Sequence, residues 1–223
     1  MKRTTVLEQL TTPDGSTMAL VEHDGARIIR VNGRELMSTR HSYSEEQLGV
    51  IACQGLAQQK DVRVLIGGLG LGFTLRAALA TLGRSAKVVV AELLADVVTW
   101  NRNPAYELAA AELADPRTEV IIGDVADVLE RSRNPFDAIM LDADNETTAM
   151  NTAGNSSLYH AAGLAKVRSK LEPHGTVVYW SAGEDPQLAK RLTAAGFEVE
   201  VRRVRKHPTA GGYHVLLVAR RGA

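Results

Sequence analysis

The sequence predicts an α/β protein built on a mostly parallel sheet, and three observations lead to this prediction. From residue 62 onward, short apolar runs alternate with segments of helical length. The apolar runs are continuous, as in 62–66, which is typical of strands covered on both faces. The last two runs, 196–203 and 212–219, have no helical pattern between them, so we expect an antiparallel hairpin at or near the sheet edge.

Each element follows from these patterns in chain order. Helices are expected between most strands, and the pair Asp185-Pro186 supplies an N-cap and a first-turn proline for the last of them. The expected strands are 62–67, 87–91, 118–122, 136–142, 174–180, 196–203 and 212–219. The expected helices are 73–82, 93–102, 105–113, 124–131, 156–170 and 186–194. The result is a Rossmann-like, seven-stranded α/β sandwich whose last strand is antiparallel.

Residues 1–43 differ from the rest and are expected to form a small N-terminal β-hairpin appendage, with the main domain spanning 44–223. Two short strands flank the turn at 23–25, and Asn32-Gly33 is a strong hairpin signal that leads into a third strand. Ser44 and Gln47 have the spacing of a capping box, which predicts a helix that begins at Ser44 as its N-cap.

Composition restricts the classes of function. A chain of 223 residues is long enough for one domain with a full core. The 26 basic and 26 acidic residues balance, so no general attraction to nucleic acid or an anionic membrane is expected. A single cysteine, Cys53, excludes an intramolecular disulfide framework and is expected in the core. We find no membrane-spanning run and no signal-peptide pattern, so a cytoplasmic location is expected.

A glycine-rich turn follows the first strand of the main domain, with Gly68, Gly70 and Gly72 at alternate positions. Such a turn between a strand and a helix lets the backbone approach a ligand closely. The spacing differs from the Gly-x-Gly-x-x-Gly pattern of nicotinamide binders, and no Gly-Lys-Ser/Thr follows as in a Walker A loop. The alternative is a structural turn that binds nothing.

Acidic residues follow the next two strands and indicate a nucleoside cofactor. Glu92, with Leu93 beside it, ends the second strand, where a carboxylate can hold two ribose hydroxyls. Asp124 follows the third strand and can accept a hydrogen bond from an adenine amino group, with Val125 packing on the ring. Alternatively, Glu92 is a surface carboxylate and Asp124 only the N-cap of the next helix.

The exit of the fourth strand carries the candidate catalytic residues Asp142, Asp144 and Asn145. Side chains at the carboxyl end of a central strand point into the ligand crevice. These three could orient an amine nucleophile, accept its proton or bind a cation. Asp142 is also a candidate for cofactor binding. The alternative role for all three is loop capping.

These motifs, in this order, resemble the spermidine synthase family, whose fold is that of the class I S-adenosylmethionine-dependent methyltransferases. The resemblance covers nearly the whole chain, including Leu158-Tyr159 before a long helix and the small N-terminal β element. It implies binding of S-adenosylmethionine or its decarboxylated form, transfer to a small-molecule acceptor, and a homodimer paired through the N-terminal hairpins. The cofactor would be held by Gly68, Gly70, Gly72, Glu92, Leu93, Asp124, Val125 and Asp142.

Departures from the family pattern bear on the reaction. The family's Gly-Gly-Gly-Asp-Gly-Gly loop places its aspartate at Leu71, and leucine there removes a charge that would repel the carboxylate of ordinary S-adenosylmethionine. Asn145 replaces a second catalytic aspartate and cannot act as a carboxylate base. The sequence therefore predicts methyl transfer ahead of aminopropyl transfer, with a non-catalytic nucleoside-binding module as a further alternative. No metal is expected, because the Asp-Asn pair of cation-dependent O-methyltransferases is missing.

Overall fold

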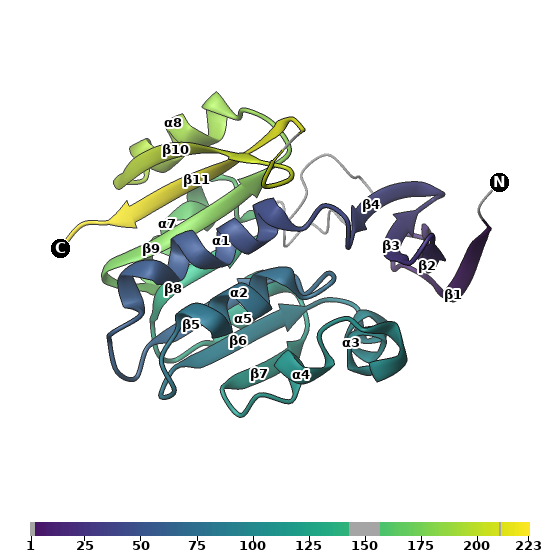
Figure 1. The fold of residues 1–223 in the computed structure, drawn as a ribbon. Coiled ribbons are helices and arrows are strands. Elements are labelled where there is room, and N and C mark those ends of the chain that lie inside the picture. The colour runs from purple at the N-terminus through teal and green to yellow at the C-terminus, as the bar shows by residue number, and fades with distance from the viewer. Residues whose placement is uncertain (1–2, 143–156, 210) are drawn as a thin grey trace.

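The computed structural model describes residues 3–142, 157–209 and 211–223. Two sheets organise this part of the chain, a small antiparallel one and a larger mixed one (Figure 1). The larger sheet has seven strands in the order β10-β11-β9-β8-β5-β6-β7, and β11 is antiparallel to its neighbours β9 and β10. This is the Rossmann-like arrangement that the sequence predicted, with the C-terminal hairpin at one edge.

The strands of the large sheet match the expected segments closely. The central parallel group consists of β5 (Arg63–Gly67), β6 (Lys87–Glu92), β7 (Thr118–Ile122), β8 (Phe136–Leu141) and β9 (Leu171–Ser181). The edge hairpin consists of β10 (Phe197–Arg205) and β11 (Tyr213–Arg221), in a continuous antiparallel register.

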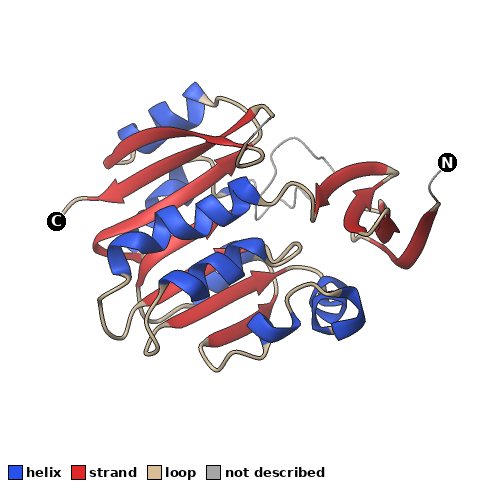
Figure 2. Ribbon diagram, in the orientation of Figure 1, coloured by secondary structure: helices blue, strands red, loops and turns tan. Residues whose placement is uncertain are grey.

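Apolar side chains alternate between the two faces of this sheet and build two cores. On one face Val64, Ile66 and Val88 pack with α1 (Tyr43–Cys53), α2 (Phe73–Thr81) and α3 (Ala95–Arg102). On the other face Leu65 and Val89 pack with α5 (Val125–Arg131), α7 (Ala161–Ser169) and α8 (Pro186–Ala194). Figure 2 shows the helices distributed over both faces of the strands. Cys53 is fully buried in the first core, as predicted.

The expected helix over 105–113 is replaced by two short pieces. A 3-10 turn, η2 (Pro104–Tyr106), is capped by the Asn103 side chain, which accepts the Ala105 amide at 3.1 Å. Glu107 then takes a left-handed conformation with φ 53° and ends the turn before α4 (Ala110–Leu113). A left-handed residue interrupts a helix, so the apolar pattern of this segment was not enough to predict its structure.

The N-terminal element is a four-stranded meander, one strand more than expected. Its strands are β1 (Thr4–Thr11), β2 (Thr17–His23), β3 (Ala26–Val31) and β4 (Arg34–Ser38), paired in chain order. Asn32 and Gly33 both have positive φ, 50° and 80°, as the predicted hairpin turn requires. The small sheet lies beyond the carboxyl ends of the parallel strands (Figure 1). The division of the chain at residue 43 stays a prediction.

The predicted capping box at Ser44 is wrong by two residues. α1 begins at Tyr43 with Ser42 as N-cap, and the Ser42 hydroxyl donates to Glu46 Oε1 at 2.7 Å. Ser44 instead lies in the first turn, 1% exposed, with its hydroxyl between Glu45 and His214. The segment 42–47 contains two serines followed by two glutamates and a glutamine, so it offers more than one cap, and the tertiary contact to His214 occupies Ser44.

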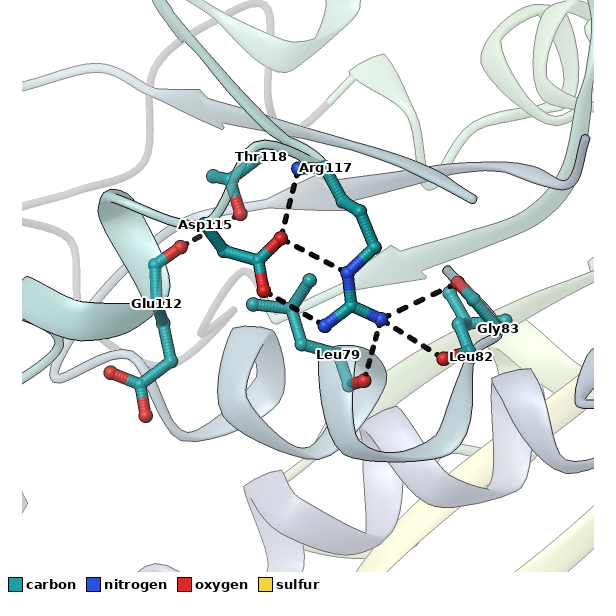
Figure 3. A network of polar contacts seen from close by, with 7 residues as sticks. All are labelled: Leu79, Leu82, Gly83, Glu112, Asp115, Arg117 and Thr118. Carbon is teal, nitrogen blue, oxygen red and sulfur yellow. Dashed lines mark hydrogen bonds and ion pairs between the residues drawn. The ribbon is translucent and has the colours of Figure 1, made fainter. Parts of the chain in front are cut away.

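The far end of α2 is held by a polar network around Arg117 (Figure 3). The Arg117 guanidinium donates to the carbonyls of Leu79 and Leu82, each at 2.9 Å, and pairs with the Asp115 carboxylate at 2.8 Å. The last carbonyls of a helix have no partner within the helix, so a cation there satisfies them and complements the helix dipole. The network fixes α2 behind the glycine turn that opens it.

A 3-10 turn, η1 (Gln54–Leu56), extends α1 toward β5.

In the part of the chain that the structure describes, no helix has the length and apolar character needed to cross a membrane.

Candidate cofactor and acceptor site

A cavity of about 710 Å³ opens at the carboxyl edge of the parallel strands. Its walls come from the strand exits of the large sheet, the first turn of α1, the β10–β11 hairpin and the small N-terminal sheet. Carboxyl ends of parallel strands are where open α/β sheets bind ligands, because the loops there diverge and leave a crevice. The volume is that of a typical small-molecule site.

The glycine turn shapes one wall of this cavity, and its three glycines have different tasks. All three have positive φ, at 98° for Gly68, 53° for Gly70 and 83° for Gly72, a conformation that favours glycine. Gly68 and Gly70 line the cavity, whereas Gly72 does not. A Cβ at Gly72 would lie 2.3 Å from the Cβ of Ala109, so this glycine permits close packing behind the turn.

Glu92 lies at the end of β6, lines the cavity and is only 4% exposed. Its Oε2 accepts the Leu69 amide at 2.8 Å and its Oε1 accepts the Leu94 amide at 2.9 Å. Burial raises the pKa of this carboxyl, and the amides of Leu94 and Leu69 act in the opposite direction by stabilising the carboxylate. The amides of Leu93 and Gly70 also stabilise this carboxylate. Glu92 is therefore not a surface carboxylate.

The other residues expected to hold a nucleoside lie on the same side of the cavity. Leu93, Asp124 and Val125 all line it. Asp124 is also the N-cap of α5 and accepts the Ala126 amide at 2.8 Å. Asp124 therefore caps α5, and a contact with adenine would be compatible with this role. Gly123, next to Asp124, has φ 157° and lines the cavity as well.

Of the three catalytic candidates, Asp142 is described and lines the cavity beside the glycine turn. Its amide donates to the Gly67 carbonyl at 3.3 Å, and its own carbonyl would lie 3.4 Å from a Cβ at Gly68. Asp142 thus joins the exits of β5 and β8. Asp144 and Asn145 lie outside the described residues, so their expected roles stay predictions.

Leu71, the position on which the expectation of methyl transfer rested, does not line the cavity. Its side chain is 1% exposed and belongs to the core beneath the turn. The glycine turn therefore adds no carboxylate to the cavity, but the Leu71 side chain itself lies away from any ligand there. A buried leucine at this position is explained by packing alone.

Sequence reasoning missed the apolar wall that the N-terminal sheet contributes. Met18, Ile29, Leu36 and Met37 line the cavity. Met37 lies directly over the glycine turn, with its sulfur 2.7 Å from where a Cβ of Gly70 would be. The alternation of apolar residues marked these strands as strands, but no local signal tells where their buried face packs.

A second group lies at the end of the cavity formed by β9, β11 and α1, and no signal in the sequence indicated the place of Glu45 and His214 in it. His41, Glu45, Trp180 and His214 line this end. Lys206 and His207, which end a basic segment over 202–207, line it as well. Two arginines of that segment pair instead with glutamates: Arg202 with Glu200, and Arg203 with Glu184.

The described residues include no group of three or more His, Cys, Asp or Glu side chains placed to hold a metal ion. What they do include fits a nucleoside: a glycine turn open to close approach, a buried carboxylate at the second strand and a carboxylate at the third. The fold is that of the Rossmann-like, S-adenosylmethionine-dependent methyltransferases, and the residues at this site are compatible with a nucleoside.

Comparison with known proteins narrows that class. No family model matches the chain. A polyamine aminopropyltransferase from Synechococcus sp. (strain JA-3-3Ab) is 34% identical over 125 residues, which are 56% of this chain and 38% of that relative. The chain thus matches well under half the length of this curated relative.

Solved structures show the same fold over almost the whole chain. A spermidine synthase in complex with the transition state analogue AdoDATO has a TM-score of 0.73 at 20% identity, covering 97% of this chain and 72% of that one. Spermidine synthase from Thermotoga maritima has a TM-score of 0.74 at 21% identity, covering 97% and 73%. The comparisons confirm the resemblance to the spermidine synthase family. They favour aminopropyl transfer, the alternative of the sequence analysis, over its first expectation of methyl transfer.

Proposed function

We propose that the protein is a transferase that binds decarboxylated S-adenosylmethionine and moves its aminopropyl group to an amine. The observation that carries this proposal is the single cavity into which the glycine turn, Glu92, Asp124 and Asp142 all converge. It occurs in a chain similar to a polyamine aminopropyltransferase. In this assignment Glu92 binds the ribose, Asp124 and Val125 hold the adenine, and Gly68 and Gly70 admit the rest of the donor.

The reaction asks for alignment more than for acid or base strength. A sulfonium is a good leaving group, so a nucleophile held in line with the carbon–sulfur bond gains most of its acceleration from proximity and orientation. Asp142 lines the cavity at the exit of β8, and in this proposal its carboxylate attracts the amine toward the donor. Asp144 and Asn145 are carried over from the motif as further acceptor-facing residues.

Ordinary S-adenosylmethionine, and with it methyl transfer, is the second candidate. One observation favours it: the glycine turn brings no carboxylate to the cavity that would repel the donor's carboxylate. The homodimer expected from the family's N-terminal hairpins is retained as a proposal, and sedimentation velocity tests it.

Calorimetry separates the two candidates. The purified chain is titrated with decarboxylated S-adenosylmethionine, with S-adenosylmethionine and with the thioether product of each. Tighter binding of the decarboxylated donor supports aminopropyl transfer, and mass spectrometry of a reaction with putrescine should then show the mass of the added aminopropyl group. Tighter binding of S-adenosylmethionine would support the second candidate, and binding of none of these nucleosides would contradict both.

A further inference from the structure

The cavity has an end that the donor assignment does not use. Going from β5 to β11 across β8 and β9 crosses three strand spacings, which places His214 about 14 Å from the glycine turn along the sheet. β11 runs opposite to the parallel strands, so its first residues lie at the same carboxyl edge. His214 therefore lines the end of the cavity opposite the glycine turn, which we call the acceptor end because the amine substrate would bind there.

A chain of hydrogen bonds fixes the orientation of the His214 ring. Nδ1 of His214 lies 2.9 Å from the Ser44 hydroxyl, and that hydroxyl donates to Glu45 Oε2 at 2.5 Å. Ser44 and Glu45 are 1% and 7% exposed, so water does not compete for these bonds. Trp180 packs against the ring edge to face, with centroids 4.5 Å apart.

This arrangement favours one tautomer of His214. A serine hydroxyl carries one proton, and with Glu45 ionised Ser44 gives that proton to Glu45, so the contact with His214 then requires that Nδ1 be the donor. Nε2 then carries the lone pair. Among the described residues no hydrogen-bond partner reaches Nε2, although the side chain lines the cavity. Nε2 is thus available as a hydrogen-bond acceptor at the end of the cavity where the amine substrate would bind.

The surroundings keep the ring neutral. Partial burial, with the charges of Lys206 and His41 nearby, lowers the pKa of His214 to about 4. Glu45 is the acidic group nearest in the hydrogen-bonded chain, and it is already engaged by Ser44. At neutral pH His214 is therefore a hydrogen-bond acceptor rather than a cation, and it is a weak base.

We infer that His214 Nε2 accepts a hydrogen bond from the nucleophilic N–H of the acceptor amine, and that Ser44 and Glu45 are positioning residues that hold the required tautomer. The inference rests on the proposed function. One N–H bound to Nε2 leaves the amine lone pair directed at the donor carbon. The C–N bond forms as the C–S bond breaks, sulfur keeps the electron pair, and the positive charge moves to the product nitrogen as an ammonium. The substrate class is a primary amine whose reacting nitrogen is uncharged.

The key variant is His214→Asn. The asparagine amide nitrogen occupies the place of Nδ1 and can still donate to Ser44, but nothing replaces Nε2. We expect kcat/KM for putrescine, with decarboxylated S-adenosylmethionine as donor, to fall about tenfold, the loss of one hydrogen bond. Calorimetric affinity for the donor should not change. The control is His174→Asn, an exposed histidine outside the cavity and outside the hydrogen-bonded chain, which should retain kcat/KM. An unchanged kcat/KM in His214→Asn would overturn the inference.

A second readout does not depend on turnover. Long-range nitrogen-15 NMR of histidine-labelled protein should show His214 with a protonated Nδ1, and Ser44→Ala should give a mixture of tautomers. A protonated Nε2 as the main form in the wild type would overturn the inference. Putrescine added to the protein saturated with the donor's thioether product should shift the Nε2 resonance, and an unmoved resonance at saturating putrescine would also overturn it. If the wild type transfers nothing, the proposed function fails and these spectra still decide the role of His214.

Discussion

The carboxylate of Glu92 accepts the backbone amide of Leu69 at 2.8 Å, which ties the end of β6 to the glycine turn after β5. The two strands are neighbours and their exits form one wall of the cavity. The residue expected to bind the ribose is thus also the residue that sets the shape of the turn. In the proposed assignment, one side chain therefore serves both the ribose contact and the local order of the turn.

Glu92→Gln should weaken both the binding of the donor nucleoside and the stability of the glycine turn. The backbone amides of Leu69 and Leu94 donate to different oxygens of the Glu92 carboxylate, and in glutamine one of these oxygens becomes an NH2 group that cannot accept. One buried donor then has no acceptor, which destabilises the fold by about 1–3 kcal/mol. We expect a lower melting temperature and at least a tenfold loss of affinity for the donor nucleoside by calorimetry. Glu112→Gln, at an ion pair with Arg76 on the surface, is the control and should leave the affinity unchanged. Wild-type affinity in Glu92→Gln would refute the ribose assignment.

Asp124→Ser separates capping from ligand binding. Serine is as good an N-cap as aspartate, so the stability of α5 should change by only a few tenths of a kcal/mol. The shorter side chain no longer reaches an adenine amino group, and we expect about a tenfold loss of nucleoside affinity with an unchanged melting temperature. Asp185→Ser, at the N-cap of α8 where Asp185 accepts the Leu188 amide at 2.8 Å, is the matched control. If Asp124→Ser binds as tightly as Asp185→Ser, Asp124 is only a cap.

Most of the fold follows from local patterns, whereas half of the site does not. Continuous apolar runs define buried strands, and strand exits in a parallel sheet share one edge, so Glu92, Asp124 and Asp142 could be placed together from the sequence. The contact between Ser44 and His214 joins residues 170 positions apart, and no periodicity encodes it. The approach of Met37 in β4 to Gly70 in the turn after β5 is likewise a tertiary contact that no local pattern predicts.

Leu71 shows how a one-dimensional alignment can mislead about a side chain. The alignment places leucine where related enzymes carry a charge, but the structure buries that leucine in the core. Leu71→Asp should therefore fail to alter donor preference and instead lower the free energy of unfolding by several kcal/mol, because it buries an unpaired carboxylate. Leu71→Met conserves volume and should cost under about 1.5 kcal/mol. Urea denaturation measures both variants. A stable Leu71→Asp protein that prefers the decarboxylated donor more strongly would show that this side chain reaches the ligand.

The lowered pKa of His214 makes a prediction about stability against pH. In the folded state the pKa is about 4, and in the unfolded state it returns to the ordinary value of 6.5. Between these values the unfolded chain binds a proton that the folded chain does not, so this group lowers the free energy of unfolding as the pH falls from about 6.5 to about 4. Burial raises the pKa of Glu45 and Glu92, which acts in the opposite direction over the acidic range.

Comparing wild type with His214→Asn isolates the histidine from those carboxylates. Asparagine keeps the donor to Ser44 and does not titrate, so its stability relative to the wild type should rise steadily as the pH is lowered through this window and level off below about pH 4. Urea denaturation at several pH values between 7 and 4 measures the difference. A stability difference independent of pH would mean that His214 titrates normally in the folded protein. The interpretation that Ser44 and Trp180 hold a neutral ring would then be wrong.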